Sequence, residues 1–384
     1  MSDSLPPPLM TSEAGSFAQA TIVERKPQII KQIIDDNGYP PEIVESLGAF
    51  EKEIAGECVQ SLAETTPDTA VWNREIGGHQ GKTWLELPWY LAEAYFYRRL
   101  LEAIGYLQPG PWQGQDPFAP QKRRQERIAA EWAQWKDNRQ ALTFEALLHS
   151  SLWGNRADLS NYTVREQART GMSVLQERHH LLIDDTQEVS ELLSAGVERV
   201  DILTDNTGRE LLSDLALAEF LLGEGWVGRI FLHLKDRPFF VSDAMSQDVQ
   251  SLVAEIREEA LGQRLSGYLE EGCLELRSDP FWTGPFMFRR LSQRLEHELS
   301  QSDLVILKGD VNYRRLLHDR HWAPTTPMAE AAGYFPASFL TLRTLKGEII
   351  VGLQPGEAAA LTAQDPSWQI NGRRGVVHLH RKTN

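Results

Sequence analysis

The later part of the chain alternates short β-branched runs with longer amphipathic segments, and this alternation restricts the possible folds more than any other feature. The runs that have the length of buried strands lie at residues 200–204, 229–234, 304–308 and 339–342. Between them, residues 211–222 and 245–261 space their apolar side chains as helices do. Strands alternating with helices are typical of a mostly parallel sheet covered by helices on both faces. We therefore expect an α/β fold, a three-layer α/β/α sandwich.

The first part of the chain is predicted to be helical instead. Apolar residues recur at helical spacing in four segments, residues 29–34, 43–54, 87–104 and 120–142. At 384 residues the chain is long enough for two or three domains. We expect a flexible tail over residues 1–15, which contains three consecutive prolines, an N-terminal all-α domain over 16–150 and the α/β/α domain over 151–384.

Composition narrows the class of partner. Acidic residues outnumber basic ones by 54 to 39, a net charge of −15, which disfavours non-specific binding to nucleic acid or to anionic membranes. The two cysteines, Cys58 and Cys273, are far apart and have neither metal-binding nor redox spacing, so a reducing compartment is expected. No signal peptide and no apolar run of about 20 residues is recognisable. These features predict a cytoplasmic protein whose partner is a small molecule, not a nucleic acid or a membrane.

Polar residues follow each of the four predicted strands. In chain order these residues are Asp205 and Asn206, then Asp243, then Asp310 and Asn312, and last Arg343 and Lys346. Ligands of parallel sheets bind at the carboxyl ends of the strands. Carboxylate and amide oxygens suit Mg²⁺ or Mn²⁺, and nearby cations would neutralise a phosphate. The convergence of these residue types predicts a metal and phosphate site.

Each segment also has an ordinary structural explanation. Thr207 and Glu210 fit a capping box, and Asp243 and Asp310 fit single helix N-caps. Arg343 and Lys346 could be solvated charges of an edge strand. The pair Asp205-Asn206 is harder to explain in this way, because a helix needs one N-cap and the box already supplies Thr207.

Several segments resemble the motifs of one known family. Residues 205–215, Asp-Asn-Thr-Gly-Arg-Glu-Leu-Leu-Ser-Asp-Leu, resemble the DNxGxELxxDL motif of the metal-dependent damage-control phosphatases, also called domain of unknown function 89 or acidic-residue methyltransferase-like. Residues 308–314 resemble its GDxNYR segment, and residues 343–346, Arg-Thr-Leu-Lys, resemble the RTxK motif of its subfamily III. Residues 152–159 resemble a further segment of the family, which lies upstream of these motifs. The resemblance extends in order from residue 88 to residue 375.

The resemblance implies a fold, a cofactor and a substrate class. The fold would be a helical N-terminal domain packed on an α/β/α sandwich. The metal would be a single divalent ion, Mn²⁺, Co²⁺, Ni²⁺ or Mg²⁺, bound by Asp205, Asn206 and Asp243. The substrate would be a sugar phosphate of the fructose 1-phosphate or fructose 6-phosphate type, removed as metabolite damage control. Its contacts would be Glu210, Asp243, Arg343, Thr344, Lys346 and a late basic residue, Arg373, which Arg374 adjoins.

The implied reaction is hydrolysis of a phosphate monoester, with Lys346 and Arg343 taking up phosphate charge. The nucleophile stays open between a water held by the metal, with Asp310 or Glu210 as the positioning or basic group, and Asp205 itself through an aspartyl-phosphate. An S-adenosylmethionine-dependent carboxyl methyltransferase acting on acidic residues of proteins is the alternative function. It is disfavoured because residues 205–208 contain only one glycine. A non-catalytic module that binds a metal or a sugar phosphate is the third possibility.

The remaining candidates lie outside the main motifs. Asn155 and Asp158 are expected near the ligand because Gly154 would let the backbone approach it closely. Asn312 is a further candidate for substrate contact. Glu93 and Arg98 are interpreted as solvated helix charges. His378 and His380 share one face of a terminal strand, where a two-histidine metal site would be possible.

Overall fold

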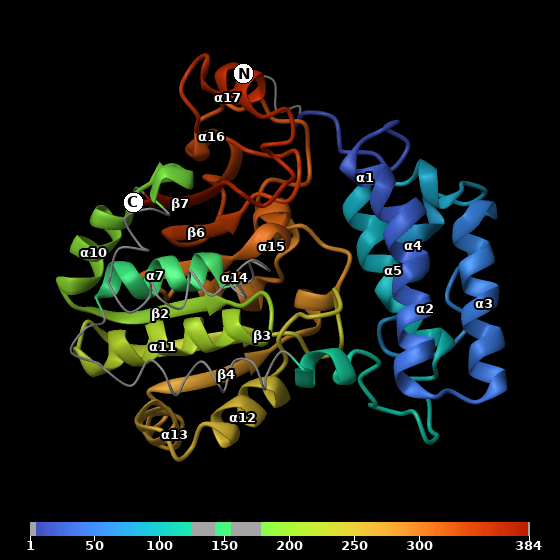
Figure 1. The fold of residues 1–384 in the computed structure, drawn as a ribbon, viewed down its shortest axis with the longest axis horizontal. Coiled ribbons are helices and arrows are strands. Elements are labelled where there is room, and N and C mark those ends of the chain that lie inside the picture. The colour runs from blue at the N-terminus through green and yellow to red at the C-terminus, as the bar shows by residue number, and fades with distance from the viewer. Residues whose placement is uncertain (1–4, 125–142, 155–177, 383–384) are drawn as a thin grey trace.

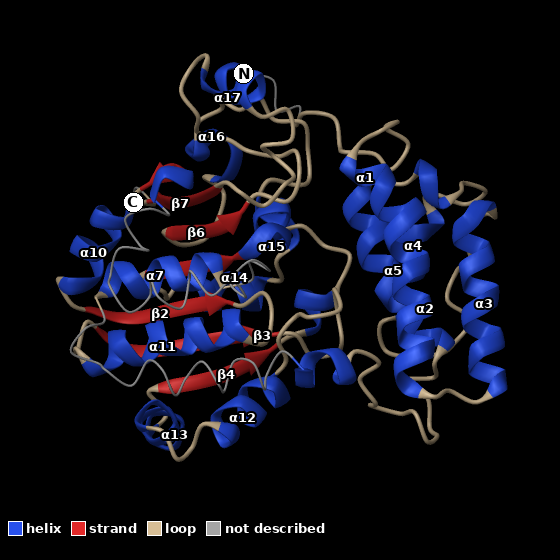
Figure 2. Ribbon diagram, in the orientation of Figure 1, coloured by secondary structure: helices blue, strands red, loops and turns tan. Residues whose placement is uncertain are grey.

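The computed structural model describes residues 5–124, 143–154 and 178–382, and it consists of a helical part and an α/β part (Figure 1). The helical part begins with α1 (Phe17–Ala20), which continues through a π-helix (Thr21–Arg25) into α2 (Lys26–Asn37). It also contains α3 (Pro41–Gly56), α4 (Thr69–Gly77) and α5 (Trp89–Ala103). Figure 2 shows these helices packed together beside one edge of the sheet, the edge toward which strands β2 and β3 point. An N-terminal helical region is therefore confirmed.

The α/β part is built on one seven-stranded sheet with the order β1-β7-β6-β5-β2-β3-β4. Its strands are β1 (Leu181–Asp184), β2 (Val197–Leu203), β3 (Val227–Leu234), β4 (Leu274–Ser278), β5 (Leu304–Lys308), β6 (Phe339–Thr344) and β7 (Gly375–His380). Strands β2 to β6 are mutually parallel, and β7 runs antiparallel to β6. The chain moves from β2 outward to β3 and β4 and then returns to the other side of β2 with β5. The strand order therefore reverses between β2 and β5, where ligands of such sheets bind.

Helices cover both faces of the sheet, as a three-layer sandwich requires. One face packs on α7 (Phe144–Trp153), α10 (Thr186–Ser194), α11 (Arg209–Gly223), α12 (Ser246–Glu255) and α13 (Ala260–Glu271). The other packs on α14 (Gln293–Leu299), α15 (Gly309–Leu316) and α16 (Met328–Ala332), while α17 (Glu357–Gln364) lies toward the sheet end near β7. Side chains alternate between the two cores along a strand, since Ile306 joins the first and Leu307 the second. The predicted fold class is confirmed.

The second core continues into the helical part, so the two parts share apolar packing. Leu307 and Phe339 of the sheet belong to the same buried cluster as Phe96 and Leu100 of α5. Helix α7, by contrast, packs on α11 of the sandwich, although most of it lies within the expected helical domain of residues 16–150. We therefore propose that the boundary between the domains precedes Thr143.

Two local expectations differ from the structure. Residues 7–11, expected in a flexible tail, pack against the body, where Leu9 is buried, donates from its N–H to the Asp319 carbonyl (3.0 Å) and accepts from the Trp89 N–H (2.9 Å). The single helix expected over residues 245–261 is divided into α12 and α13. The chain turns between them over residues 256–259. Gly262 of α13 lets this turn pack closely on the helix, because a Cβ there would lie 2.1 Å from the Ile256 carbonyl oxygen. The helix expected over residues 120–142 lies outside the described residues beyond Arg124.

Within the described ranges, no helix is long and apolar enough to cross a membrane.

Candidate active site

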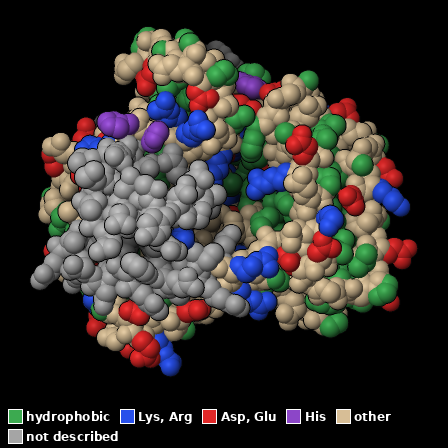
Figure 3. All heavy atoms as spheres, viewed as in Figure 1, with side chains coloured by type: hydrophobic (Ala, Val, Ile, Leu, Met, Phe, Trp, Pro, Cys, Tyr) green, Lys and Arg blue, Asp and Glu red, His purple; other side chains and the backbone are tan. Residues whose placement is uncertain are grey.

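A cavity lies between the carboxyl ends of the central strands and the helical part. Its polar wall on the sheet side is formed by Asp205, Asn206, Glu210, Asp243, Asp310, Thr344 and Lys346. The helical part contributes Phe17, Arg25, Trp89 and Glu93. A space-filling view shows a hollow between the two parts, with Lys and Arg side chains along its edges (Figure 3). Most of the residues that the sequence predicted to form a site therefore meet at the reversal of strand order.

Backbone hydrogen bonds hold the loops after β2 and β3 together. The Ala244 N–H donates to the Asp205 carbonyl (2.8 Å), and the Thr207 N–H donates to the Ser242 carbonyl (2.7 Å). This pairing, an isolated β-bridge between Asn206 and Asp243, fixes the two predicted carboxylate ligands of the metal side by side. The same loop after β3 holds Val241 at φ 65°, a conformation that β-branched residues rarely adopt. Such strained backbone is concentrated at functional sites.

Side chains of the β2 loop converge on one another at the floor of the cavity. The Asn206 Nδ2 donates to Asp205 Oδ2 (2.7 Å) and to Glu210 Oε2 (3.0 Å), while the Ser242 hydroxyl donates to Asn206 Oδ1. Gly309, the first residue of α15, has φ +81°, and a Cβ there would lie 2.0 Å from Asp205 Oδ2. Only glycine leaves room for this carboxylate.

The floor of the cavity carries more negative charge than its neighbours balance. Burial raises the pKa of Asp205 well above its usual value, and the carboxylates of Glu210 and Asp243 raise it further. Burial also raises the pKa of Asp243, opposed by Lys235, whose Nζ lies 3.0 Å from Asp243 Oδ2. Lys308 Nζ lies 3.4 Å from Glu210 Oε1. A crowded group of buried carboxylates is an environment that attracts a cation.

The residues present fit a divalent ion, on one condition. Asp205 and Asp243 supply two hard oxygen ligands, and Asn206 can supply a third. Because its amide nitrogen faces Asp205 and Glu210, the Asn206 amide would have to turn so that its oxygen faced the ion. Within the part of the chain that the structure describes, no three His, Cys, Asp or Glu side chains are arranged to hold a metal by themselves. The ion would therefore depend on the Asn206 amide, on water and on substrate oxygens.

A cation and a hydroxyl lie on the β6 side of the cavity. Leu342, Thr344 and Lys346 all line it, at the spacing of two residues that places side chains on one face of a strand. Among the described residues Lys346 forms no ion pair, although its charge acts on Asp205 and lowers the pKa of that carboxyl, so its ammonium group can still donate to a phosphate. The Thr344 hydroxyl donates to the Leu152 carbonyl (3.1 Å) and its oxygen can still accept.

Arg343 points away from the cavity. It alternates with Thr344 along β6, is completely buried, and donates to Asp310 Oδ1 (2.7 Å), to the Gly347 carbonyl (3.1 Å) and to the Ile349 carbonyl. The alternation along a strand could have indicated this from the sequence. Its predicted contact with substrate is therefore unsupported, and its role in the structure is to fix the loop that carries Lys346.

Asp310 and Asn312 are also engaged within the protein. Burial raises the pKa of Asp310, but Arg343 and Arg314 outweigh burial and hold that pKa well below its usual range. Such a carboxylate is a poor proton acceptor near neutral pH, which counts against the predicted role of Asp310 as a base. The Asn312 amide donates to the carbonyls of Leu203 and Thr204 (3.3 Å each) and does not line the cavity.

Of three further predicted contacts, one is outside the cavity wall and two are outside the described residues. Arg373 does not line the cavity, and its backbone N–H donates to Asn371 Oδ1 (3.0 Å). Asn155 and Asp158 lie outside the described residues. Gly154, from which their prediction followed, has a different role, because a Cβ there would lie 2.7 Å from the Glu210 Cα. The glycine allows α7 to approach α11.

Several participants were missed by sequence reasoning. Lys308, the last residue of β5, is buried and pairs with Asp214 (2.9 Å), and burial raises the pKa of that carboxyl to about 6. Glu93, interpreted as a solvated helix charge, is buried in the cavity wall. His378 is half-buried on β7, and burial lowers its pKa to about 4, which weakens the case for a two-histidine metal site with His380.

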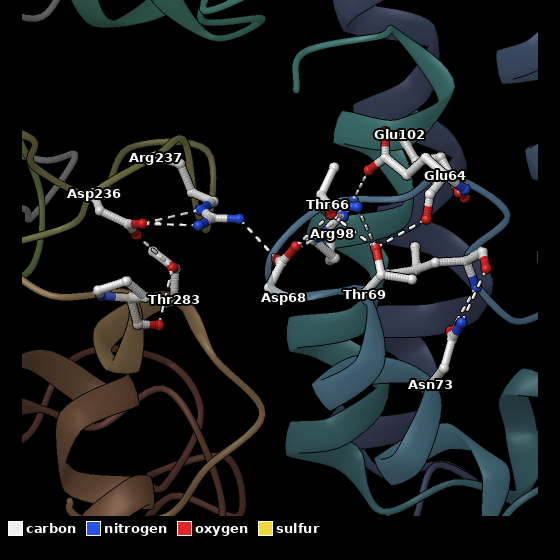
Figure 4. Close-up of polar contacts among 12 residues, drawn as sticks. Glu64, Thr66, Asp68, Thr69, Asn73, Arg98, Glu102, Asp236, Arg237 and Thr283 are labelled. Atoms are coloured by element: carbon white, nitrogen blue, oxygen red, sulfur yellow. Dashed lines mark hydrogen bonds and ion pairs between the residues drawn. The ribbon is translucent and has the colours of Figure 1, made fainter. Parts of the chain in front are cut away.

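A polar network ties the helical part to the loop that carries Asp243. Asp68 accepts from Arg98 Nε (2.8 Å) on α5 and from Arg237 Nη1 (2.7 Å) in the loop after β3, as Figure 4 shows. Arg237 also pairs with Asp236, which accepts from the Thr283 hydroxyl. The network explains why Arg98, expected to be solvated, is buried, and it fixes the two sides of the cavity relative to each other.

Comparison with known proteins assigns the chain to a family. A profile of the family "Damage-control phosphatase ARMT1-like domain" matches residues 21–361. Proteins named damage-control phosphatase ARMT1 from Mus musculus and Homo sapiens are 33% and 32% identical, each over 97% of this chain and 98% of the relative. The one from Danio rerio is 32% identical over 98% of this chain and 97% of its own length.

The fold has a counterpart among solved structures. The crystal structure of a DUF89 family protein from Pyrococcus horikoshii matches with a TM-score of 0.55 at 15% identity, covering 95% of this chain and 98% of that one. At that identity the likeness concerns the fold alone. The family profile and the relatives, which cover nearly the whole chain, go further. The chain belongs to the damage-control phosphatase ARMT1-like family, and with it to the phosphatases.

Proposed function

We propose that this protein hydrolyses sugar phosphate monoesters, of the fructose 1-phosphate or fructose 6-phosphate type, in a reaction that depends on a divalent metal ion. The observation that carries the proposal is that one cavity has carboxylates on its floor and a cation on one side. Its floor collects the carboxylates Asp205, Glu210 and Asp243, and its β6 side presents Lys346 without an ion-pair partner among the described residues. A metal site beside a cation that pairs with no described carboxylate is the arrangement that phosphoryl transfer needs.

Asp205, Asn206 and Asp243 would hold the ion, one of Mn²⁺, Co²⁺, Ni²⁺ and Mg²⁺. When bound, it would polarise the phosphate and offset its charge as the ester bond breaks. Lys346 would bind a phosphate oxygen from the opposite side, with Thr344 beside it. Arg343 and Asp310 would act through position, because their ion pair anchors the segment between Thr344 and Ile349.

Glu210 is the better candidate for the group that positions or deprotonates the attacking water. Both carboxylates line the cavity, but that of Asp310 is paired with two arginines. Attack by Asp205 itself is the competing route. Gly309 leaves the Asp205 carboxylate room at the floor of the cavity, but a metal ion held by this carboxylate would engage its lone pairs and disfavour attack. Trapping a phosphorylated aspartate during turnover would decide for Asp205.

The methyltransferase alternative is not favoured. The relatives that cover the chain are named phosphatases, and the loop after β2 carries carboxylates in place of a glycine-rich turn. We further propose a cytoplasmic location and a small phosphorylated metabolite as the partner. Both cysteines are free, as a reducing compartment would leave them, and the net charge of −15 disfavours nucleic acid.

Phosphate release by metal-stripped protein tests the proposal. A panel of sugar phosphates would be supplied with Mg²⁺, Mn²⁺, Co²⁺ or Ni²⁺ in turn. We expect turnover only with added metal, abolished by Asp205→Ala and retained by Asp35→Ala, which removes an exposed carboxylate of α2. Absence of release with every metal and ester would refute a sugar phosphatase, and binding of S-adenosylmethionine by the same protein would revive the alternative.

A further inference from the structure

We infer that the helical part supplies the recognition surface for the hydroxylated carbon chain of the substrate, with Glu93 as the hydrogen-bond acceptor and Arg25 as a donor. The inference rests on the proposed function, because it assigns the part of the cavity opposite the phosphate. It adds residues from outside the sandwich to the site. The sugar would then be selected by one part of the protein and its phosphate ester broken by the other.

The position of Glu93 is the first observation. It lies on α5, which packs beside the sheet edge (Figure 1), and its side chain is 1% exposed while lining the cavity. Its Oε2 lies 2.5 Å from Lys26 Nζ, which is itself completely buried over the rings of Phe96 and Tyr97. Within the described residues, Glu93 accepts no hydrogen bond apart from this ion pair. A buried carboxylate in a cavity wall therefore retains acceptor capacity that no protein group uses.

Unused acceptor capacity in a buried site is costly unless a ligand satisfies it. Water can do so in the free protein, and a hydroxyl group of a ligand can do so in the complex. A second phosphate could not, because two anions would be brought together in a poorly solvated place. The geometry therefore points to a neutral, hydrogen-donating part of the substrate at Glu93.

Arg25 is the second observation. It is the last residue of the π-helix, an irregular turn that is frequent at functional sites, and it lines the same cavity. Among the described residues it forms no ion pair, and it is exposed. A guanidinium so placed can donate to hydroxyl or carbonyl oxygens of the substrate.

Trp89 completes the wall with an apolar surface. It lies one turn before Glu93 on α5, where residues four apart share a face. The Arg314 guanidinium covers one side of its ring at 4.0 Å from the centroid, which fixes the ring. An aromatic surface in the same cavity wall as the Glu93 carboxylate and the Arg25 guanidinium suits a ligand with both C–H and O–H groups, as a sugar has.

Polarity also sets the orientation of the substrate. Lys346 and the metal-binding carboxylates lie on the sheet side, and Glu93 lies on the helical side. Lys346 and a metal ion held by those carboxylates would attract the phosphate, and Glu93 would repel it. The carbon chain must then extend from the sheet edge toward α5.

Glu93→Gln tests this inference with two substrates. One is the sugar phosphate that the wild-type protein hydrolyses best, and the other is p-nitrophenyl phosphate, which has no hydroxyl groups. The amide keeps an acceptor oxygen but removes the negative charge, which should weaken the hydrogen bond and lower kcat/KM for the sugar phosphate about tenfold. The value for p-nitrophenyl phosphate should change less than about twofold, because that ester has no hydroxyl to lose. Arg25→Gln, at an exposed position, should change the ratio in the same direction.

Matched variants separate recognition from folding. Glu53→Gln alters another buried carboxylate of the helical part, paired with Arg99 at 2.5 Å and absent from the cavity wall. It should leave the ratio of the two kcat/KM values unchanged. If Glu93→Gln fails to fold because Lys26 loses its partner, the double variant Lys26→Met/Glu93→Leu replaces the pair by apolar side chains, which is often neutral for stability.

The outcomes are distinguishable. An unchanged ratio of kcat/KM values in the folded Glu93 variant and in Arg25→Gln would overturn the inference while leaving the phosphatase intact. A wild-type protein that hydrolyses p-nitrophenyl phosphate but no sugar phosphate would instead refute the proposed substrate class. A protein that releases phosphate from neither ester would refute the proposed function itself.

Discussion

Gly309→Ala is the substitution whose effect the structure defines most sharply. Gly309 follows β5 directly, and its φ of +81° lies in the region that favours glycine. A methyl group there would lie 2.0 Å from Asp205 Oδ2 and 2.2 Å from Asp205 Cγ, where ordinary contacts begin at 3.4 Å. The carboxylate, the α15 backbone or both must therefore move by more than an ångström.

Two effects of different size follow from this clash. The backbone conformation alone should lower the free energy of unfolding by about 1 to 2 kcal/mol. Displacement of a metal-binding carboxylate by about 1 Å should lower activity by roughly 100-fold, since catalytic geometry tolerates little misplacement. We expect the loss of metal-dependent kcat/KM at 25 °C to be larger than the loss that a greater unfolded fraction of the protein would cause.

Gly272→Ala is the matched control. Gly272 has a similar φ of +74° at the end of α13, but nothing lies within 4 Å of its added Cβ. It should show the same loss of unfolding free energy in urea and retain wild-type phosphate release. Wild-type kcat/KM in Gly309→Ala, or an equal loss of activity in Gly272→Ala, would refute the assignment of Asp205 to the reaction.

Three further predictions test the electrostatics. Asp205→Asn should abolish phosphate release without lowering the free energy of unfolding, because it removes one of several crowded buried carboxylates; a lower urea midpoint would contradict this. Asp310→Ala should cost about 3 kcal/mol of stability in urea unfolding, because it removes the anion that pairs with the buried Arg314 and Arg343; a loss below about 1 kcal/mol would argue against the pairing. Burial, with a smaller contribution from nearby arginines, lowers the pKa of His318 to about 4 from 6.5, so the unfolded chain binds more protons between these values. Stability should therefore fall as pH drops from 6.5 toward 4, and His318→Asn should reduce that dependence when unfolding is measured at about pH 7 and pH 5.

The sequence alone determined the sandwich and the edge of the sheet where the site lies. Buried parallel strands need continuous apolar runs. Residues 304–308 and 339–342 could therefore be recognised as strands from their own sequence, without knowledge of the strands that pair with them. Parallel strands bring their carboxyl ends to one edge, so Asp205 and Asp243 could be expected together although they are distant in the chain. The family motifs added the metal and the substrate class as expectations.

The alternation of side chains along β6 could also have predicted which cation of the Arg-Thr-Leu-Lys motif faces the cavity. Side chains alternate along a strand, so Thr344 and Lys346 cannot share a face with Arg343. The Arg-Thr-Leu-Lys motif therefore contains one structural cation and one available to a ligand. Its similarity to a family motif does not distinguish the two.

Only the tertiary structure decided which charges face the cavity from outside the sandwich. Glu93 and Arg98 lie on the same helix with similar sequence surroundings, yet Glu93 lines the cavity and Arg98 pairs with Asp68 and Glu64. Helical periodicity gives the angle of a side chain around the helix axis, and so the face of the helix on which it lies, but not what packs against that face. That depends on how α5 docks on the sheet edge, and the docking is fixed by contacts between residues far apart in the chain, such as Arg237 with Asp68.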